Sequence, residues 1–388
     1  MRAERRLVLC VAIAILVGTV ARVVTAFATF GVGFDIETFQ IVAHAVRASG
    51  AGVYDTGRWL YPPGYLPVLG AADAVAEATG LPFHGVVQLP PIAADAGLAV
   101  LVAAILRRTG ASDRTVLAGA ALVALGPSFA FVSGFHGQID AVAILPAVAG
   151  VLLWVRDAPR RALWAGLLIG VGAAVKSLPL FCVLPLLPSA RSRREAFTLV
   201  AAAVAVPLLA LAPFLLSDAG TVVASLRENR GVPGFGGLSA LLQPSLARWW
   251  ATFGPVPALS PLVSSISSVQ NVIVGVAALL AAALAARRRA PPLDGLALLW
   301  MTVLVVNPNP SYQYLVWGLP FLAAAGRLRA CALVQLAFLV PSVLIYFRPG
   351  IDGSGWVYFA TAELGWAVLA AVWVGELRRR YDAARAIP

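Results

Sequence analysis

Charge is scarce in this sequence of 388 residues, of which only 12% are Asp, Glu, Lys or Arg, whereas 60% are hydrophobic. Its three cysteines all lie in apolar stretches, so the sequence indicates neither a disulfide framework nor a zinc site. It contains no P-loop and no GxGxxG, HExxH, GxSxG or paired-cysteine motif. Nucleotide-driven transport and cytoplasmic nucleotide-sugar chemistry therefore lack their usual machinery, and neither is predicted.

Long apolar runs dominate the sequence, and the mean hydropathy is +0.86. A helix needs about 20 predominantly apolar residues to cross a bilayer. Runs of that order occur, for example, at residues 7–27, 85–106 and 196–216. The first run is long for a signal peptide, so we expect an uncleaved first helix. The pattern predicts an all-α polytopic membrane protein with about 10–13 transmembrane helices.

The net charge of +11 comes from short arginine clusters between the apolar runs, the last of them at residues 378–380. Cytoplasmic loops carry such an excess of basic residues, so we assign these clusters to the cytoplasmic side. The resulting path through the membrane needs two short helices over residues 162–189, which meet near Lys176 and Ser177. It also requires residues 64–79 to form an interfacial helix instead of a span.

With this orientation the unusual polar residues share the non-cytoplasmic side, which predicts one outward-facing site in the plasma (inner) membrane. They lie in GFDIETF (33–39), FHGQID (135–140), at Lys176, in the loop 217–267, in NPNPSYQY (307–314) and at Arg348. The expected organisation is a catalytic membrane module (1–216, with a first external loop 28–84), an external loop (217–267) with an amphipathic helix from Leu238 to Trp250, and C-terminal transmembrane helices (268–388).

Asp35 and Glu37 are the candidate catalytic acids, because they follow the first apolar run and precede a segment with helical spacing. A carboxylate at the membrane surface can take a proton from an acceptor hydroxyl. Asp35 also suits the N-cap of the following helix, and the two roles are compatible. His44, further along the segment, is a candidate ligand for the sugar or the acceptor.

Two other segments supply candidate ligands for a sugar, an acceptor or a phosphate. Tyr61, in RWLYPPGYLP, is a candidate sugar or acceptor contact, or else part of an aromatic belt at the interface. In FHGQID, His136 is a candidate phosphate ligand, and Gln138 and Asp140 are candidate sugar ligands. The alternative for this segment is an ordinary polar helix N-terminus.

Lys176, Arg227 and Arg230 are the candidate cations for a phosphate. Lys176 is the single lysine among 29 basic side chains and interrupts an apolar segment, where a cation is costly and usually functional. It suits a phosphate as a point charge, or it snorkels to the headgroups. Arg227 and Arg230 precede a glycine-rich turn and suit either a bound phosphate or anionic headgroups.

A last polar segment, NPNPSYQY, carries Asn309, Tyr312 and Gln313, which are compatible with sugar binding. The alternative is an ordinary loop with aromatic anchors.

The order of these motifs resembles the GT-C superfamily of integral membrane glycosyltransferases, in its polyprenyl-phosphate-sugar-dependent, mannosyltransferase-like branch. The similarity rests on the acidic motif after the first apolar run, followed by YPPGYLPVLG, GFHGQIDAVAILP, GAAVKSLPLFCVLPLLP and NPSYQYLVWGLPFL. It covers residues 1–216 well and the final third loosely.

The resemblance implies a GT-C-like helix bundle that transfers mannose or a related sugar from a polyprenyl-phosphate donor to a lipid or glycan hydroxyl on the outer face. It implies Asp35 as the general base and Glu37 as the second acid of the pair. The leaving phosphate needs cations, and the candidates are His136, Lys176, Arg227 and Arg230.

The implied partners are the donor, the acceptor and membrane lipids, without nucleic acid. We expect no cofactor, and no metal because those cations are available to the phosphate. The competing predictions are a transporter or flippase of lipid-linked sugars, whose charges would spread through the bilayer midplane, and a non-catalytic assembly subunit.

Overall fold

The computed structural model describes residues 2–252, 255–347 and 353–379, so Arg348 and Arg380 lie outside the described residues. The structure is 82% helical, and the described residues contain no strand. Seven helices in these ranges are long and apolar enough to cross a membrane. The prediction of an all-α polytopic membrane protein is therefore confirmed.

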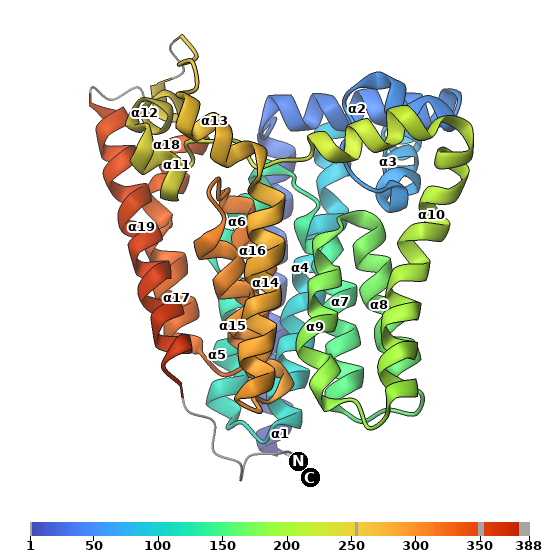
Figure 1. The fold of residues 1–388 in the computed structure, drawn as a ribbon, viewed down its shortest axis with the longest axis vertical. Coiled ribbons are helices and arrows are strands. Elements are labelled where there is room, and N and C mark those ends of the chain that lie inside the picture. Colours follow the sequence, from blue (N-terminus) through green and yellow to red (C-terminus); the bar gives the residue numbers. More distant parts are fainter. Residues whose placement is uncertain (1, 253–254, 348–352, 380–388) are drawn as a thin grey trace. The chain divides into compact units, whose positions relative to one another are not determined.

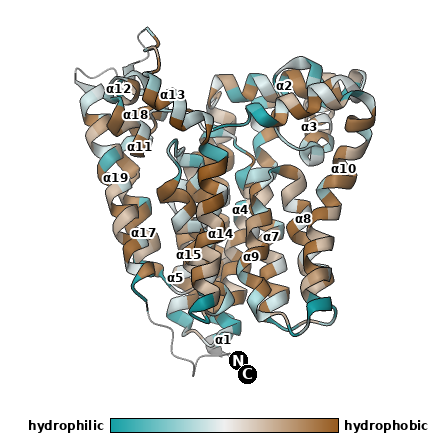
Figure 2. Cartoon of the chain, in the orientation of Figure 1, coloured by the Kyte–Doolittle hydropathy of each residue, from teal (hydrophilic) through white to brown (hydrophobic). Residues whose placement is uncertain are grey.

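The seven candidate spans are Glu4–Ala28, Phe83–Arg108, Asp113–His136, Arg193–Glu228, Gln270–Arg287, Leu328–Phe347 and Ser354–Leu377. Four shorter apolar helices accompany them: Asp140–Val155, Arg161–Val175, Leu178–Ser189 and Pro292–Val306. Figure 2 shows hydrophobic residues along the helices and hydrophilic residues gathered toward helix ends and connections.

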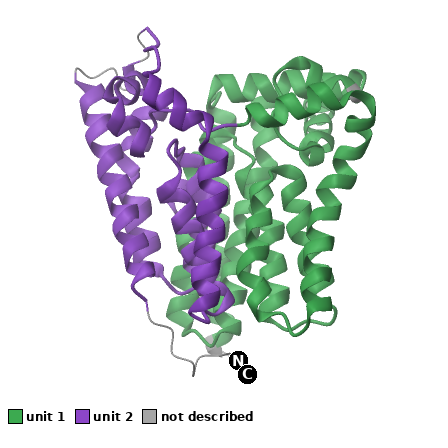
Figure 3. Ribbon diagram, viewed as in Figure 1, with its two compact units in different colours: residues 1–125, 129–229 green, residues 126–128, 230–388 purple. Residues whose placement is uncertain are grey.

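The chain forms two compact units (Figure 3). Unit 1 consists of residues 1–125 and 129–229, and unit 2 of residues 126–128 and 230–388. The boundary near residue 229 falls inside the segment 217–267, whose first part is helical up to Glu228.

Unit 1 is a bundle of apolar helices. Its main members are α1 (Arg2–Ala28), α4 (Phe83–Arg108), α5 (Asp113–Ala124), α7 (Asp140–Val155), α8 (Arg161–Val175) and α10 (Arg193–Glu228). Helix α8 packs against both α7 and α10, and α4 packs against α1, α5 and α7. Ser192 begins α10 as its N-cap, because its side chain accepts the N–H of Glu195.

Two helices of unit 1, α2 (Gly33–Ala48) and α3 (Leu66–Thr79), lie across one end of this bundle (Figure 1). Helix α2 buries Ile36, Phe39 and Val42 in a core cluster that includes Trp59. The 14 residues of α3 would extend only about 21 Å, short of the roughly 30 Å hydrocarbon layer. Helix α3 is not among the candidate spans, in agreement with the predicted interfacial helix.

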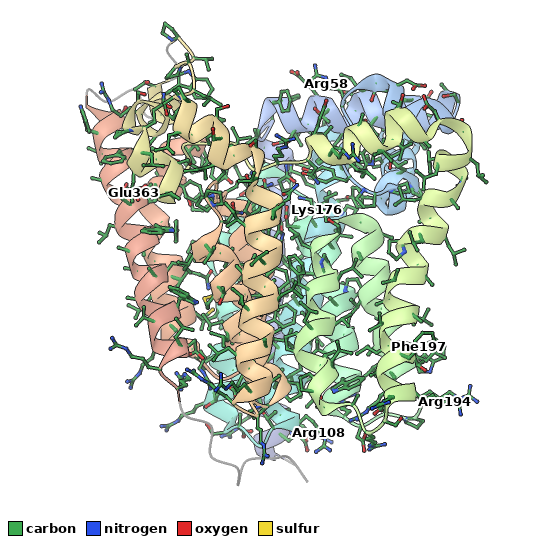
Figure 4. All side chains as sticks on the ribbon, viewed as in Figure 1. Arg58, Arg108, Lys176, Arg194, Phe197 and Glu363 are labelled. Atoms are coloured by element: carbon green, nitrogen blue, oxygen red, sulfur yellow. The ribbon has the colours of Figure 1, made fainter. Side chains whose placement is uncertain are left out.

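The ends of unit 1 differ in their charged residues. Arg108 and Arg194 lie at one end of unit 1, and Arg58 lies at the other end, beside α2 (Figure 4). Lys176 lies nearer the Arg58 end. Arg108 and Arg194, both predicted to be cytoplasmic, are therefore separated along the bundle from Lys176.

The helices over residues 161–189 break where the sequence predicts. Helix α8 ends at Val175, Lys176 is its C-cap in extended backbone, and the 3-10 helix η4 (Leu178–Cys182) follows with Pro179 near its start. Proline in the first turn cannot continue the preceding helix, because it lacks an N–H. The short α9 (Val183–Leu186) and η5 (Leu187–Ser189) complete the return.

Whereas the short α6 (Pro127–Phe131) is divided between the units, unit 2 contains the α-helices that follow residue 230. They are α11 (Gly237–Leu242), α12 (Pro244–Thr252), α13 (Pro261–Ser268), α14 (Gln270–Arg287), α15 (Pro292–Val306), α16 (Leu315–Ala324), α17 (Leu328–Ala337), α18 (Leu339–Phe347) and α19 (Ser354–Leu377). The segment Leu238–Trp250, expected to form an amphipathic helix, is helical with one break. Gln243 and Pro244 divide that segment into α11 and α12, because proline starts a helix better than it continues one.

Candidate active site around Asp35

Asp35 lies in the first turn of α2 and contacts His136. Its Oδ2 is 2.6 Å from His136 Nε2, and the two side chains are 24% and 11% exposed. The helix begins at Gly33 with Val32 as the N-cap, which makes no side-chain cap hydrogen bond. The prediction that Asp35 caps α2 is therefore wrong, although a negative charge in the first turn still suits the helix dipole.

Two glycines allow the close approach that joins Asp35 to His136. Gly31 has φ +76°, and a Cβ there would lie 2.5 Å from the carbonyl oxygen of Phe135. Gly137 has φ +82°, and its Cβ would lie 2.9 Å from Ile36 Cδ1. Any side chain at either position is strained in this backbone region and meets atoms of the opposite segment.

Lys176 is the centre of a second set of polar contacts in unit 1. Its Nζ donates to Asp140 Oδ2 at 2.8 Å and to Gln138 Oε1 at 3.2 Å. The ring of Tyr61 lies 4.7 Å from the same Nζ, within the range of a cation–π contact. The Lys176 and Asp140 side chains are only 5% and 0% exposed, so this ion pair is enclosed in protein.

Asp35 is connected to this second set through Gln138, whose side chain also hydrogen-bonds the Asp35 carboxyl. Burial by itself would raise the pKa of Asp35. The hydrogen bond and charge of His136, the hydrogen bond of Gln138 and the charge of Lys176 outweigh burial and hold that pKa below its usual value. Asp35 is therefore an ionised carboxylate at neutral pH.

Tyr61 differs from Asp35 because its environment suppresses ionisation. Burial raises the pKa of Tyr61, and the charges of Asp35 and Asp140 raise it further. The phenol therefore stays protonated and can act only as a neutral hydrogen-bonding group or as an aromatic surface.

Glu37 and His44 do not join the Asp35 contacts. Residues two apart on a helix point roughly 200° apart around its axis, and Glu37 is exposed whereas Asp35 is partly buried. The His44 side chain is 62% exposed, and its Nε2 lies 3.2 Å from Asp73 Oδ1 on α3. Arg47 also contacts Asp73, so this part of α2 is tied to α3.

The two candidate arginines are both exposed but belong to different units. Arg227 lies in the last turn of α10 in unit 1. Arg230 is the first residue of the segment 230–388, which forms most of unit 2.

The remaining candidates lie in unit 2. Asn309 is fully buried and donates from Nδ2 to Gln270 Oε1 at 2.7 Å and to Ser267 Oγ at 3.0 Å. Tyr312 shares a 2.7 Å hydrogen bond with the hydroxyl of Tyr358, and burial raises its pKa well above the usual value. Gln313 follows it and is half-buried.

The sequence analysis missed a buried ion pair in unit 1. Arg22 Nε lies 3.1 Å from Asp95 Oδ2, and their side chains are 3% and 1% exposed. Arg22 also donates to the carbonyls of Ala124 and Val123, at 2.5 and 3.2 Å, at the end of α5. The sequence does contain a signal for this ion pair: Arg22 and Asp95 each interrupt an apolar run, and charges in such runs usually pair inside a helix bundle.

Metal binding finds no preformed site in the described part of the chain, where no group of three or more His, Cys, Asp and Glu side chains could hold an ion. Around Asp35 the structure brings together a carboxylate, the imidazole of His136 and the ammonium group of Lys176.

Comparison with known proteins identifies a family. The family model described as Glycosyltransferase family 87 matches residues 59–308, well over half of the chain. The matched range includes Tyr61, the 135–140 segment, Lys176 and both candidate arginines, and it begins after Asp35. A search of curated proteins returns no match.

Proposed function

Because this chain belongs to glycosyltransferase family 87, a GT-C-type family of membrane glycosyltransferases, we propose that it uses a polyprenyl-phosphate sugar as its donor. The acceptor is a hydroxyl of a lipid or glycan, the sugar is mannose or a related sugar, and Asp35 is the general base. The reaction takes place at the non-cytoplasmic face of the plasma membrane. The family match favours this enzyme over a transporter or flippase of lipid-linked sugars.

In the proposed reaction, the acceptor oxygen forms a bond to the anomeric carbon of the donor sugar while the bond from that carbon to the phosphate oxygen breaks. The acceptor proton passes to the Asp35 carboxylate. The electron pair of the broken bond stays with the polyprenyl phosphate, whose growing negative charge requires nearby cations or hydrogen-bond donors. No oxidation occurs, and no nucleotide is consumed.

The observation that carries the proposal is the state of Asp35. Its carboxylate is partly exposed, is held ionised by His136 and Gln138, and keeps lone pairs beyond those two contacts. Glu37 is exposed on another face of α2 and has no comparable surroundings among the described contacts. We therefore assign proton removal to Asp35 and give Glu37 a secondary role in positioning the sugar or the acceptor.

The donor phosphate is proposed to contact His136, Lys176, Arg227 or Arg230. His136 is next to Asp35 and is the best situated of the three candidates in unit 1. Arg227 and Arg230 are exposed and can approach a headgroup directly. Lys176 is enclosed by Asp140, so direct contact with phosphate would require it to leave that partner.

Polar side chains are proposed as ligands for the hydroxyls of the sugar or the acceptor. In unit 1 these are His44, Tyr61, Gln138 and Asp140, of which Tyr61, Gln138 and Asp140 all contact Lys176. In unit 2 they are Asn309, Tyr312 and Gln313. Asn309 and Tyr312 already take part in buried hydrogen bonds, so their effect on the sugar would come through the surrounding loop.

The decisive experiment incubates the purified protein in lipid nanodiscs with a panel of radiolabelled polyprenyl-phosphate sugars and a membrane lipid extract. We expect transfer of label from one of these donors to a new lipid or glycan product, and at least 100-fold slower transfer by Asp35→Asn protein. Use of a nucleotide sugar in place of every polyprenyl-phosphate sugar would refute the donor assignment.

The arginines are tested in the same assay. We expect Arg227→Ala or Arg230→Ala to raise the KM for the donor, because each removes a cation from an exposed position. Arg194→Ala is the matched control, because Arg194 lies in the first turn of α10 and Arg227 in its last turn. An unchanged donor KM in both variants would assign the phosphate to other residues.

A further inference from the structure

A polar pocket of about 110 Å³ opens in unit 1 between α10 and the 3-10 helix η1 (Ala51–Thr56). The side chains that the argument uses are Tyr54, Asp55, Phe214, Ser217, Asp218 and Thr221. The sequence analysis named no individual residue at 54–55 or 217–221 as a candidate ligand, although it placed the loop 217–267 on the side of the site.

The pocket is formed by a bend in α10. Asp218 has φ −153° and ψ 89°, which are not helical angles, so the helix is interrupted there. The Asp218 carboxylate then accepts the backbone N–H of Thr221 at 3.1 Å and its hydroxyl at 2.6 Å. This is the N-cap arrangement that restarts a helix. The bend is therefore fixed by specific hydrogen bonds, and the pocket is a built feature of the fold.

The pocket lining combines hydrogen-bonding groups with an aromatic ring. Two carboxylates, Asp55 and Asp218, and two hydroxyls, Ser217 and Thr221, line it. The ring of Phe214 lies edge-on to Tyr54, with ring centroids 5.4 Å apart, so its orientation is fixed by packing.

The lining chemistry selects the class of ligand. The lining contains two carboxylates and no cationic side chain, so it repels phosphate and other anions. Carboxylates accept hydrogen bonds from ligand hydroxyls, and a packed aromatic ring offers an apolar surface. We propose that this pocket binds an uncharged sugar ring.

The pocket is connected to the Asp35 contacts through two tyrosines. Tyr54 donates its hydroxyl to the Tyr61 carbonyl at 2.9 Å, and the Tyr61 ring lies against Lys176. A sugar in the pocket is therefore separated from the Lys176 contacts by the Tyr54–Tyr61 layer, and it is not the reacting sugar. Resting on the proposed function, this assigns the pocket to a sugar unit of the acceptor glycan beyond the reacting hydroxyl.

Direct binding tests the pocket without any need for transfer. The probes are methyl mannopyranoside and methyl arabinofuranoside, measured by saturation-transfer difference NMR on protein in nanodiscs, with inorganic phosphate as a charged comparison. We expect a signal from at least one methyl glycoside, which Asp55→Asn weakens at least threefold and Ser217→Trp abolishes by filling the pocket. Asp113→Asn, an exposed acid on α5, is the matched control and keeps the signal.

The outcomes separate the pocket from the proposed reaction. No signal with any glycoside, or a signal unchanged by both pocket variants, would overturn the pocket assignment. Calcium binding that both variants remove, without glycoside binding, would overturn it in favour of a cation site. Glycoside binding by a protein that transfers none of the donors would refute the proposed reaction and leave the pocket standing.

Transfer assays then identify the source of the sugar. If the pocket binds a sugar of the acceptor, we expect Asp55→Asn to raise the KM for the acceptor at least threefold and to leave the KM for the donor unchanged. A raised donor KM with an unchanged acceptor KM would assign the pocket to the sugar of the donor and overturn the acceptor assignment.

Discussion

Replacement of Asp35 by Asn separates the catalytic role of this residue from its structural roles. The substitution keeps the size of the side chain and its ability to accept a hydrogen bond from His136, 2.6 Å away. It replaces the carboxylate, which accepts the proton in the proposed reaction, with an amide that is not basic. Loss of a general base costs about 10²–10⁴-fold in rate, which corresponds to about 2.7–5.4 kcal/mol of activation free energy.

The expected structural cost of the same change is smaller. Asp35 is not the N-cap of α2, so no capping hydrogen bond is lost. Loss of the first-turn charge costs about 0.3–1 kcal/mol, and conversion of a charge-assisted hydrogen bond to a neutral one costs about 1 kcal/mol more. Because the Asp35 side chain is 24% exposed, we expect a decrease of about 1–2 kcal/mol in the free energy of unfolding. Such a decrease leaves a typical domain folded.

The assay compares single-turnover rates, donor binding and thermal unfolding for wild-type, Asp35→Asn and Glu37→Gln proteins in nanodiscs. We expect Asp35→Asn to bind donor and unfold cooperatively while its turnover falls by at least 100-fold, within the range for base removal. Glu37→Gln, on the exposed face of the same helix, should fall by less. Near-normal turnover in folded Asp35→Asn protein would refute the reasoning, and a larger loss in Glu37→Gln would make Glu37 the base.

Three further predictions concern charge and orientation. His136→Gln removes a positive charge that holds down the pKa of Asp35, so the acid limb of kcat/KM should move to higher pH, and an unmoved limb would contradict this coupling. Lys176→Met should reduce activity more than Lys176→Arg, because the buried carboxylate of Asp140 loses its cation only in the Met variant. A raised donor KM in Lys176→Met would indicate that Lys176 binds the phosphate, and a lowered kcat would indicate that it positions Asp35. The topology is tested in a protein whose native cysteines are replaced by serine. Glu37→Cys should react with an impermeant maleimide in intact cells, whereas Arg194→Cys should react only after permeabilisation. The reverse pattern would show that the predicted topology is inverted.

The fold was predictable from the sequence because hydropathy and helix breakers act locally. The long apolar runs correspond to helices such as α4 and α10, and the break at Lys176 occurs where Pro179 prevents continuation. The bend at Asp218 was missed, because the apolar run ends close to it and hydropathy cannot distinguish a bent helix from a loop.

The candidate site was predictable only as a set of segments. The sequence identified Asp35, the 135–140 segment and Lys176, and these meet within unit 1. It did not identify which carboxylate pairs with which cation, since partners far apart in sequence leave no local pattern. Asp140, predicted as a sugar ligand, is the ion-pair partner of Lys176.

The ion pair between Arg22 and Asp95 affects the order in which the chain assembles in the membrane. Helix α1 is synthesised before α4, so Arg22 enters the membrane while its partner does not yet exist. An arginine costs about 2.5–3.5 kcal/mol at the centre of an inserting helix, and Arg22 lies closer to the end of α1, where the cost is lower. Near the C-terminal end of α1, the Arg22 side chain can first extend to the lipid headgroups and turn inward only after α4 and α5 have inserted. Helix α1 thus acquires its final contacts only after α4 and α5 have been made.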